Sequence, residues 1–188
     1  MSFLQGGFTL TNKTPSPAGV TKPAAIAALQ DHDHFLRADP HLTTYQLLSP
    51  STTNPSSSPD YASYQDVKVY EVHDHVPNPV WSSDVTSLEE FVDCAEGIWV
   101  RVRSPLGIVL ETTWFICDKK DKKDGRDGLE LELVQTLVCT CNRLLASLTK
   151  GQVEKGWQQV HEKLIQGMVE DRTAAATAGA AAVLTAKA

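Results

Sequence analysis

The feature that most constrains this chain is an abrupt change of hydrophobic period in its C-terminal third. From Leu129 to Cys139, leucine recurs at nearly every second position, which is the period of a half-buried β-strand. Beyond Leu144 the apolar residues fall three or four positions apart, on one stripe of a helix that we expect to end near Val169: Val153, Trp157, Val160, Leu164 and Met168. A single helix that follows a run of strands must bury this stripe against a sheet. A sheet curled around one helix commonly leaves a pocket, so the sequence predicts a ligand-holding domain.

Size, charge and cysteine content define the general class of the chain. At 188 residues it fits one domain, expected at residues 1–170 and large enough to bury a core without disulfides. The four cysteines lack the spacing of a zinc site and no secretory segment precedes them, which favours reduced thiols and a cytoplasmic location. The net charge of −6 argues against nucleic-acid binding, and no apolar run is long enough for membrane insertion. The oligomeric state is left open.

The remaining segments predict an antiparallel sheet and one further helix. That helix has Thr21 as its cap and Pro23 in its first turn, and its helical spacing extends to Asp33. Strands are expected at Phe8–Asn12, Thr43–Leu48, Ser63–Val76, Val85–Cys94, Ile98–Ser104 and Ile108–Cys117. Short turns at 95–97 and 104–107 make neighbouring strands antiparallel. Surface loops are expected at 49–60 and 119–126, and the Ala-rich tail at 171–188 is expected to fray.

Three stretches, at residues 28–33, 70–77 and 98–107, carry a resemblance to a known superfamily. Together with the order of elements, they make the chain resemble the START-like (SRPBCC, Bet v 1-like, polyketide cyclase) superfamily from about Phe8 to Val169. More narrowly, the chain is similar to uncharacterised START-like proteins of fungi. The resemblance implies an α+β helix-grip fold, in which a curved antiparallel β-sheet wraps around a long C-terminal α-helix. The superfamily includes lipid carriers, hormone receptors, aromatases, cyclases and occasional pericyclases, so the resemblance implies a cavity and leaves the chemistry open.

Strand alternation selects the side chains that should face the cavity. Thr112 and Trp114 are expected to point inward, whereas Trp99 is expected on the outer face as a surface aromatic. Gln135 is the one polar side chain among the inward residues of the last strand. A buried amide needs a partner, which is either a neighbouring backbone group or a bound ligand.

The histidines offer two further candidates for the cavity. His34 is expected either at the pocket mouth or as an ordinary exposed histidine. His161 lies four residues after Trp157, either as a proton donor in the cavity or packed at the edge of the helix stripe. His73 and His75 share one strand face, but no distant third ligand is placed beside them, so we expect no metal site.

Two functional classes follow from this reading. The first is a cofactor-independent enzyme of secondary metabolism that confines a polyketide- or terpenoid-like intermediate and promotes cyclisation, isomerisation or a pericyclic reaction such as a Diels-Alder cycloaddition. Its expected catalytic residues are Tyr70, Gln135 and His161, and its expected substrate-binding residues are Thr112, Trp114, Trp157 and His34. The alternative is a non-catalytic carrier or sensor of a hydrophobic small molecule, which needs the same pocket and no proton-transfer group.

Overall fold

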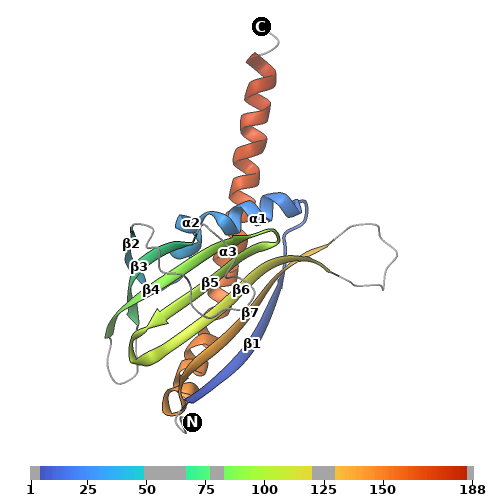
Figure 1. Cartoon of the computed structure of the whole chain (residues 1–188). Helices are drawn as coiled ribbons and strands as arrows, with labels where there is room; N and C mark the ends of the chain where they lie inside the picture. Colours follow the sequence, from blue (N-terminus) through green and yellow to red (C-terminus); the bar gives the residue numbers. More distant parts are fainter. Residues whose placement is uncertain (1–4, 49–66, 77–82, 120–129, 186–188) are drawn as a thin grey trace.

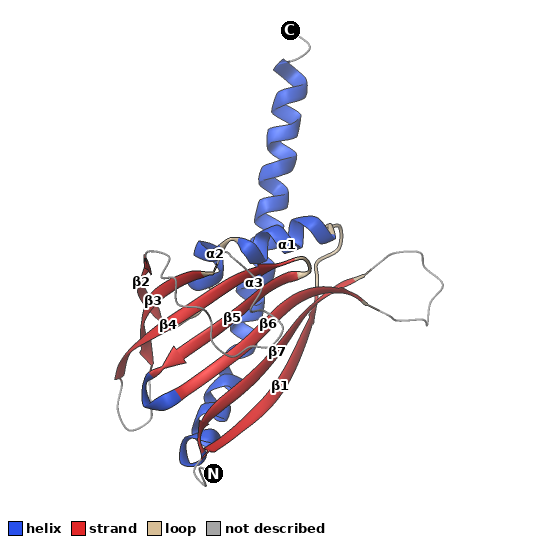
Figure 2. Cartoon of the chain, in the orientation of Figure 1, coloured by secondary structure: helices blue, strands red, loops and turns tan. Residues whose placement is uncertain are grey.

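The computed structural model describes residues 5–48, 67–76, 83–119 and 130–185, with side chains described as far as residue 169. Figure 2 distinguishes the helices from the strands. In chain order the elements are β1 (Gln5–Pro15), α1 (Lys22–Gln30), α2 (His32–Arg37), β2 (Leu42–Leu48), β3 (Lys68–Val76), β4 (Ser83–Cys94), β5 (Gly97–Ser104), the short 3-10 helix η1 (Pro105–Gly107), β6 (Ile108–Asp118), β7 (Leu131–Asn142) and α3 (Arg143–Thr185).

The described strands form one antiparallel sheet of seven strands, in the order β1-β7-β6-β5-β4-β3-β2. Strands β2 to β7 are a meander, and β1 pairs with β7 along its whole length, from Gln5 opposite Asn142 to Pro15 opposite Glu132. Figure 1 shows the sheet curving around α3 while α1 and α2 cover one end. The α+β helix-grip fold that the sequence predicts is therefore confirmed.

The first helical segment differs from the prediction, because it is two helices rather than one. α1 ends at Gln30, and Asp31 starts α2 by accepting a hydrogen bond from the backbone N–H of His34 at 3.2 Å. An aspartate in this position caps the new helix and redirects the chain. At the other end of α1, Thr21 is the cap that the sequence predicts, with the Ala24 N–H 3.4 Å from its hydroxyl oxygen.

The last helix is longer than expected at both ends. It was expected over about 145–169 and runs from Arg143 to Thr185, so its backbone continues through most of the Ala-rich segment. Figure 1 shows this last part projecting beyond the sheet. The fraying of the tail stays a prediction. No helix in the described ranges combines the length and the hydrophobicity needed to cross a membrane. The two predicted surface loops lie largely or wholly outside the described residues.

The outer face of β5 is more buried than alternation alone predicts. Trp99 lies on this face, but only 2% of it is exposed, so the expectation of a surface aromatic is wrong. It packs against Val92, and the guanidinium of Arg101 lies 4.9 Å from its ring centroid. Arg101 is itself buried, and it pairs with Glu111 at 2.6 Å and Glu90 at 3.3 Å. These carboxylates compensate the charge and allow the arginine to be covered.

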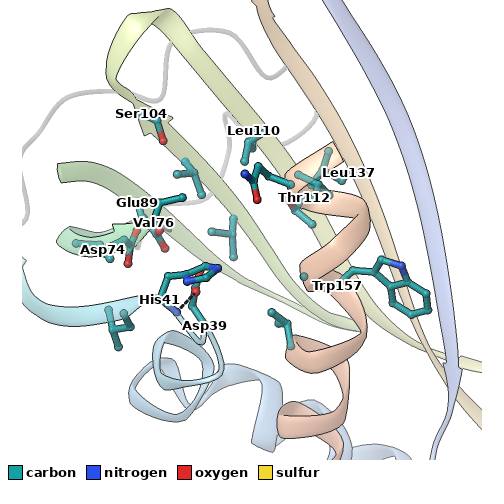
Figure 3. A pocket seen from close by; sticks show the side chains of 18 of the residues that line it. Asp39, His41, Asp74, Val76, Glu89, Ser104, Leu110, Thr112, Leu137 and Trp157 are labelled. Atoms are coloured by element: carbon teal, nitrogen blue, oxygen red, sulfur yellow. Dashed lines mark hydrogen bonds between the residues drawn. The ribbon is translucent and has the colours of Figure 1, made fainter. Parts of the chain in front are cut away.

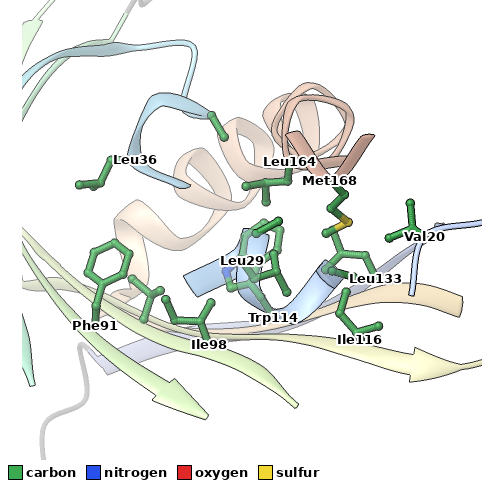
Figure 4. Close-up of a cluster of buried hydrophobic side chains, with 14 of the residues drawn as sticks. Val20, Leu29, Leu36, Phe91, Ile98, Trp114, Ile116, Leu133, Leu164 and Met168 are labelled. Atoms are coloured by element: carbon green, nitrogen blue, oxygen red, sulfur yellow. The ribbon is translucent and has the colours of Figure 1, made fainter. Parts of the chain in front are cut away.

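The hydrophobic core fills the end of the molecule that α1 and α2 cover (Figure 4). Leu164 and Met168 on α3 are almost fully buried there, as is Leu29 on α1. They pack over sheet residues of β4 to β7: Phe91, Ile98, Trp114, Ile116 and Leu133. The C-terminal part of the predicted α3 stripe therefore belongs to the core, which leaves the earlier turns of α3 to face a different environment.

Candidate ligand cavity

A cavity of about 420 Å³ lies between the sheet and the first turns of α3 (Figure 3). Its volume is within the range of small-molecule sites. Most of its lining side chains are apolar and come from β3, β5, β6 and β7 on the sheet side and from α3 on the other: Val72, Val100, Val102, Ile108, Leu110, Leu137, Leu148, Val153 and Val160. Residues between α2 and β2 close one end. The sheet and helix thus form the pocket that the sequence predicts.

Thr112, Trp114 and Gln135 all line this cavity, on the strand face that alternation predicts. The strand register brings two of them together, because Trp114 on β6 stands directly opposite Gln135 on β7. Gln135 in turn stands opposite Asn12 on β1. A row of polar and aromatic side chains therefore crosses the inner face of the sheet.

The side-chain oxygen of Gln135 is occupied by two neighbours. It accepts a hydrogen bond from Asn12 Nδ2 at 2.9 Å and another from His161 Nε2 at 3.3 Å. Gln135 is 5% exposed and lines the cavity. Because the oxygen is used by the protein, the amide group offers the cavity its nitrogen, which is a hydrogen-bond donor. The sequence leaves open a neighbouring backbone group or a ligand contact, and the structure instead gives the amide oxygen two side-chain partners.

His161 lies behind Gln135 and is not among the described residues that line the cavity. Its Nδ1 is 2.9 Å from the hydroxyl oxygen of Thr14, and its ring packs between Trp114 and Trp157, with centroids 5.1 and 5.2 Å away. Burial lowers the pKa of His161 to about 4, so the ring is neutral near pH 7. A neutral ring with a donating Nε2 can orient Gln135, whereas it is a poor proton donor to a substrate.

Trp157 borders the cavity through only part of its side chain. It lies on α3 and is half-buried, and Figure 3 shows its indole ring turned away from the cavity. The ring meets His161 edge-on. Trp114 is different, because it is 5% exposed and packs edge-on against Phe35 with centroids 5.3 Å apart. Of the two predicted aromatic walls, Trp114 is therefore the more fully enclosed.

Tyr70 lies outside the described cavity lining, in a chain of hydrogen bonds that runs from the buried Tyr70 and His32 to the exposed Asp93. Its hydroxyl group lies 3.0 Å from His32 Nδ1, and His32 Nε2 lies 3.0 Å from Asp93 Oδ1. Phe91 packs against both rings. Burial is the main reason that the pKa of Tyr70 is raised and that of His32 lowered. This chain links α2 to the sheet, and it does not bring the Tyr70 hydroxyl to the cavity lining.

His34 also lies away from the described cavity lining. The break at Asp31 sets α2 in a new direction, and the His34 ring packs against α3 at Gly167. A methyl group built on Gly167 would clash with His34 Nε2, which shows how closely the ring approaches the helix backbone. Neither the pocket mouth nor an ordinary exposed position describes this histidine, because its Nε2 is buried.

Three carboxyl groups at one end of the cavity were missed by the sequence reading. Asp39 follows α2, Asp74 is on β3 and Glu89 is on β4, and all three line the cavity together with His41 (Figure 3). Asp39 Oδ1 accepts a hydrogen bond from the backbone N–H of His41 at 2.7 Å. No hydrogen bond or ion pair joins Asp74 or Glu89 to another side chain in the described part of the protein. The sequence could have indicated that Glu89 faces inward, because strand alternation places it on the same face as Phe91.

The two unpaired carboxyl groups are hard to ionise. Burial raises the pKa of Asp74 to about 6, with a smaller contribution from Asp39. Burial raises the pKa of Glu89 to about 8, and the charges of Asp74 and Asp39 add to the effect. Two interacting carboxyl groups with different pKa values are suited to opposite proton-transfer roles near pH 7. Asp74 is then mostly a base, and Glu89 is mostly an acid.

His73 and His75 have separate acidic neighbours on the other face of β3. His73 Nε2 is 3.3 Å from Glu71, and His75 Nδ1 is 2.8 Å from Asp84. Within the described ranges no group of three or more His, Cys, Asp or Glu side chains is arranged to hold a metal ion. The expectation that no metal binds stays a prediction.

The fold resembles solved structures of several proteins. The Zhui aromatase/cyclase from Streptomyces sp. R1128 has a TM-score of 0.57 and 13% identity, over 87% of this chain and 93% of that chain. The di-domain ARO/CYC StfQ from the steffimycin biosynthetic pathway has a TM-score of 0.53 and 11% identity, over 91% of this chain and 53% of that chain. Ara h 8.0201 has a TM-score of 0.51 and 12% identity, over 88% of this chain and 99% of that chain.

At these identities the likeness shows the fold alone, and membership of the START-like superfamily stays a prediction. The narrower similarity to fungal proteins stays a prediction. No curated protein matches the sequence. The family described as Domain of unknown function (DUF7053) matches residues 6–170, which is nearly the whole predicted domain, and the chain therefore belongs to this family.

Proposed function

We propose that this protein is a cofactor-independent enzyme that cyclises or isomerises an apolar, carbonyl-bearing small molecule of polyketide or terpenoid type. The observation that carries the proposal is the distribution of polar groups in an otherwise apolar cavity. A donor, the Gln135 amide, stands on the sheet wall, and a carboxyl pair, Asp74 and Glu89, stands at one end. The fold shared with two aromatase/cyclases supports a ring-forming reaction.

The role of Gln135 is to bind and polarise a carbonyl oxygen. Its Nε2 donates to the substrate oxygen, and Thr112 supplies a hydroxyl group from the neighbouring strand on the same wall. A fixed donor in an apolar cavity stabilises the negative charge that develops on an enolate oxygen. Asn12 and His161 hold the amide in this orientation, so little reorganisation is needed during the reaction.

The role of the carboxyl pair is to move protons. Asp74 removes a proton from the carbon beside the bound carbonyl group, and the enolate carbon bonds to a second carbonyl carbon of the same molecule. The oxygen of that second carbonyl takes the proton of Glu89, so the product has the mass of the substrate. The proton on Asp74 then returns to Glu89 through solvent. The pKa values of about 6 for Asp74 and about 8 for Glu89 suit these directions of transfer near pH 7.

A pericyclic ring closure, such as a Diels-Alder reaction, needs only confinement and the Gln135 hydrogen bond. It gives the buried carboxyl pair no role, so proton-assisted ring closure is the form of the proposal that accounts for more of the cavity.

A second candidate, a carrier or sensor of a hydrophobic molecule, is favoured by a different observation. Tyr70 and His161, two of the three predicted catalytic side chains, are engaged by other side chains and lie outside the described cavity lining. The walls are mostly aliphatic. A carrier would keep its ligand unchanged, and this difference separates the two candidates in one experiment.

The experiment is incubation of the protein with metabolites from cells that lack it, followed by mass-resolved chromatography. We expect a product with the mass of a consumed compound. Replacing Gln135 with leucine should slow its formation by about tenfold or more, because one oriented hydrogen bond to developing charge is worth at least about 1.4 kcal/mol. Asp74→Asn should also slow it. Glu71→Gln, on the other face of the same strand as Asp74, is the matched control and should keep the rate.

A ligand retained without any product of equal mass would leave only the carrier. Unchanged turnover in a folded Gln135→Leu protein would remove Gln135 from the site, and near-UV circular dichroism of each variant checks that it is folded.

A further inference from the structure

The acidic end of the cavity is built from three separate parts of the chain. Asp39, Asp74 and Glu89 converge there, and Asp39 has its partner in the His41 backbone. No lysine or arginine is among the described residues that line the cavity. His41 is the one side chain of the lining that can carry a positive charge, among the residues described, and it also contributes to the environment of Asp74. The carboxyl charges are therefore poorly compensated by the protein.

Two unpartnered polar atoms lie near this end on the inner faces of β3 and β4, and only the first belongs to a residue of the described cavity lining. Asp74 Oδ1 is buried without a hydrogen-bond partner in the described part of the chain, and so is the hydroxyl group of Ser87. Ser87 is 3% exposed and lies between Val85 and Glu89 on the inner face of β4. The Ser87 backbone also stands opposite Val72, another lining residue. Buried polar atoms without partners are costly and uncommon, so this wall lacks the groups that would satisfy it.

We propose that the cavity binds an amphiphilic small molecule with a protonated amine, whose nitrogen lies at Asp74 and Glu89 and whose carbonyl oxygen lies at Gln135. The inference concerns the same cavity as the proposed function and goes beyond it, because Asp74 and Glu89 here hold the charge of the ligand instead of moving protons. The acidic end presents acceptors and negative charge, whereas Gln135 presents a donor. A ligand with a donor cation at one end and an acceptor at the other satisfies both, and its apolar body meets the walls between them.

An ammonium group suits this end better than a hydroxyl group. It brings three N–H donors together with a positive charge. It therefore supplies the hydrogen-bond donors and the compensating charge that the carboxyl groups lack. Charge-assisted hydrogen bonds in a desolvated site are also stronger than neutral ones. A bound ammonium group favours the ionised carboxyl forms, and amine binding should therefore strengthen as pH rises from 5 to 7.5. The titratable groups that face the site are Asp39, His41, Asp74 and Glu89, with His73 acting on Asp74 through its charge.

The test is a calorimetric titration of the full-length protein with three probes of similar length: decylamine, decanol and 2-undecanone. At pH 7.5 we expect decylamine to bind at least about tenfold more tightly than decanol. Asp74→Asn should reduce this preference to less than about threefold while decanol binding is kept. Lowering the pH from 7.5 to 5 should weaken decylamine and leave decanol unchanged. Glu71→Gln is again the control, and the pH series needs no variant at all.

Equal affinities of the wild-type protein for decylamine and decanol would overturn the amine assignment, and so would an amine preference that Asp74→Asn leaves intact. Binding of 2-undecanone separates this inference from the proposed function. If 2-undecanone binds and Gln135→Leu weakens it, the proposed function stands without the amine. If none of the three probes binds, both are lost.

Discussion

At the scale of single residues, Gln135 shows how a buried amide is given one direction. Asn12 and His161 both donate to its oxygen. Because this oxygen only accepts, Nε2 of His161 carries the ring proton and Nδ1 accepts from the Thr14 hydroxyl group. Each member has a partner, so the network avoids the cost of an unsatisfied buried polar group. The opposite is true of Asp74, whose Oδ1 has no partner among the described residues. The polar groups behind the sheet wall are thus satisfied by the protein, whereas Asp74 Oδ1 at the acidic end is not satisfied by the described residues, as the amine proposal requires.

The carboxyl group of Glu89 should make stability depend on pH in an unusual direction. Its pKa is about 8 in the folded protein against an ordinary value of 4.5, so the unfolded chain loses this proton first as pH rises. Between these values the folded state holds more protons, and stability falls with rising pH by up to about 1.4 kcal/mol per unit. Asp74 acts likewise only up to about pH 6, and His161 acts in the opposite sense between about pH 4 and 6.5.

The window from pH 6.5 to 8 therefore isolates Glu89. Urea unfolding at several pH values in this window should show the wild-type stability falling, while Glu89→Gln shows a much flatter profile and becomes the more stable protein at pH 8. Glu154→Gln, an exposed carboxyl on α3, should retain the wild-type profile. Parallel profiles for wild type and Glu89→Gln would mean that Glu89 ionises normally.

At the scale of elements, α3 serves two environments along its length. Its turns around Leu164 and Met168 complete the core under α1, whereas its turns around Leu148 and Val153 line the cavity. Leu144 and Leu148 near its start are largely exposed. One amphipathic stripe is therefore divided between the hydrophobic core and the cavity lining.

This division predicts different costs for the two tryptophans beside His161. Trp114→Ala should lower the free energy of unfolding by about 3 to 5 kcal/mol, since it removes an enclosed aromatic side chain. Trp157→Ala should cost only about 1 to 2 kcal/mol, because its ring is half-buried and turned from the cavity. Chemical denaturation of both variants measures the difference. Equal losses would place Trp157 in the core after all.

At the scale of the whole molecule, the sequence predicted the features that depend on the hydrophobic period along the chain. It missed the features that depend on distant segments meeting in space. The change of period after Cys139 predicted a helix packed on a sheet, and alternation correctly put Thr112, Trp114 and Gln135 on the inner face. The same alternation puts Tyr70 on the inner side of β3, yet α2 covers it with His32. The position of α2 follows from the break at Asp31. The spacing of apolar residues alone did not reveal that this segment forms two helices instead of one.

Local sequence patterns could not predict the acidic end of the cavity, for a related reason. Asp39, Asp74 and Glu89 come from three segments, and they line one cavity because β3 and β4 are neighbours and the α2–β2 connection closes its end. The register does not set the two strand residues opposite each other, since Asp74 stands opposite Val85 and Glu89 opposite Tyr70. Their raised pKa values come from desolvation, which depends on everything packed around them. The alternation of one strand can indicate that Glu89 faces inward. It cannot indicate that the surroundings of Glu89 are desolvated and contain few cationic side chains.

The part of α3 beyond the sheet is expected to be dispensable for the fold and the cavity. The family match ends at residue 170, and Met168 is the last core residue of α3 among the side chains described. The Ala-rich segment extends away from the sheet in Figure 1. A chain shortened to residues 1–170 should therefore unfold within about 2 °C of the full-length protein, since surface changes usually alter stability by less than about 0.5 kcal/mol. It should also bind 2-undecanone with the same affinity.

A second truncation, to residues 1–163, is the matched control. It removes Leu164 and Met168, each 1% exposed, and should lower the melting temperature by at least about 10 °C or prevent folding, because two fully buried side chains are lost. Calorimetric melting of the three chains compares them directly. The prediction would be wrong if the 1–170 chain had a melting temperature as low as that of the 1–163 chain. The Ala-rich segment would then pack on the domain, and the stabilising part of α3 would extend beyond Met168.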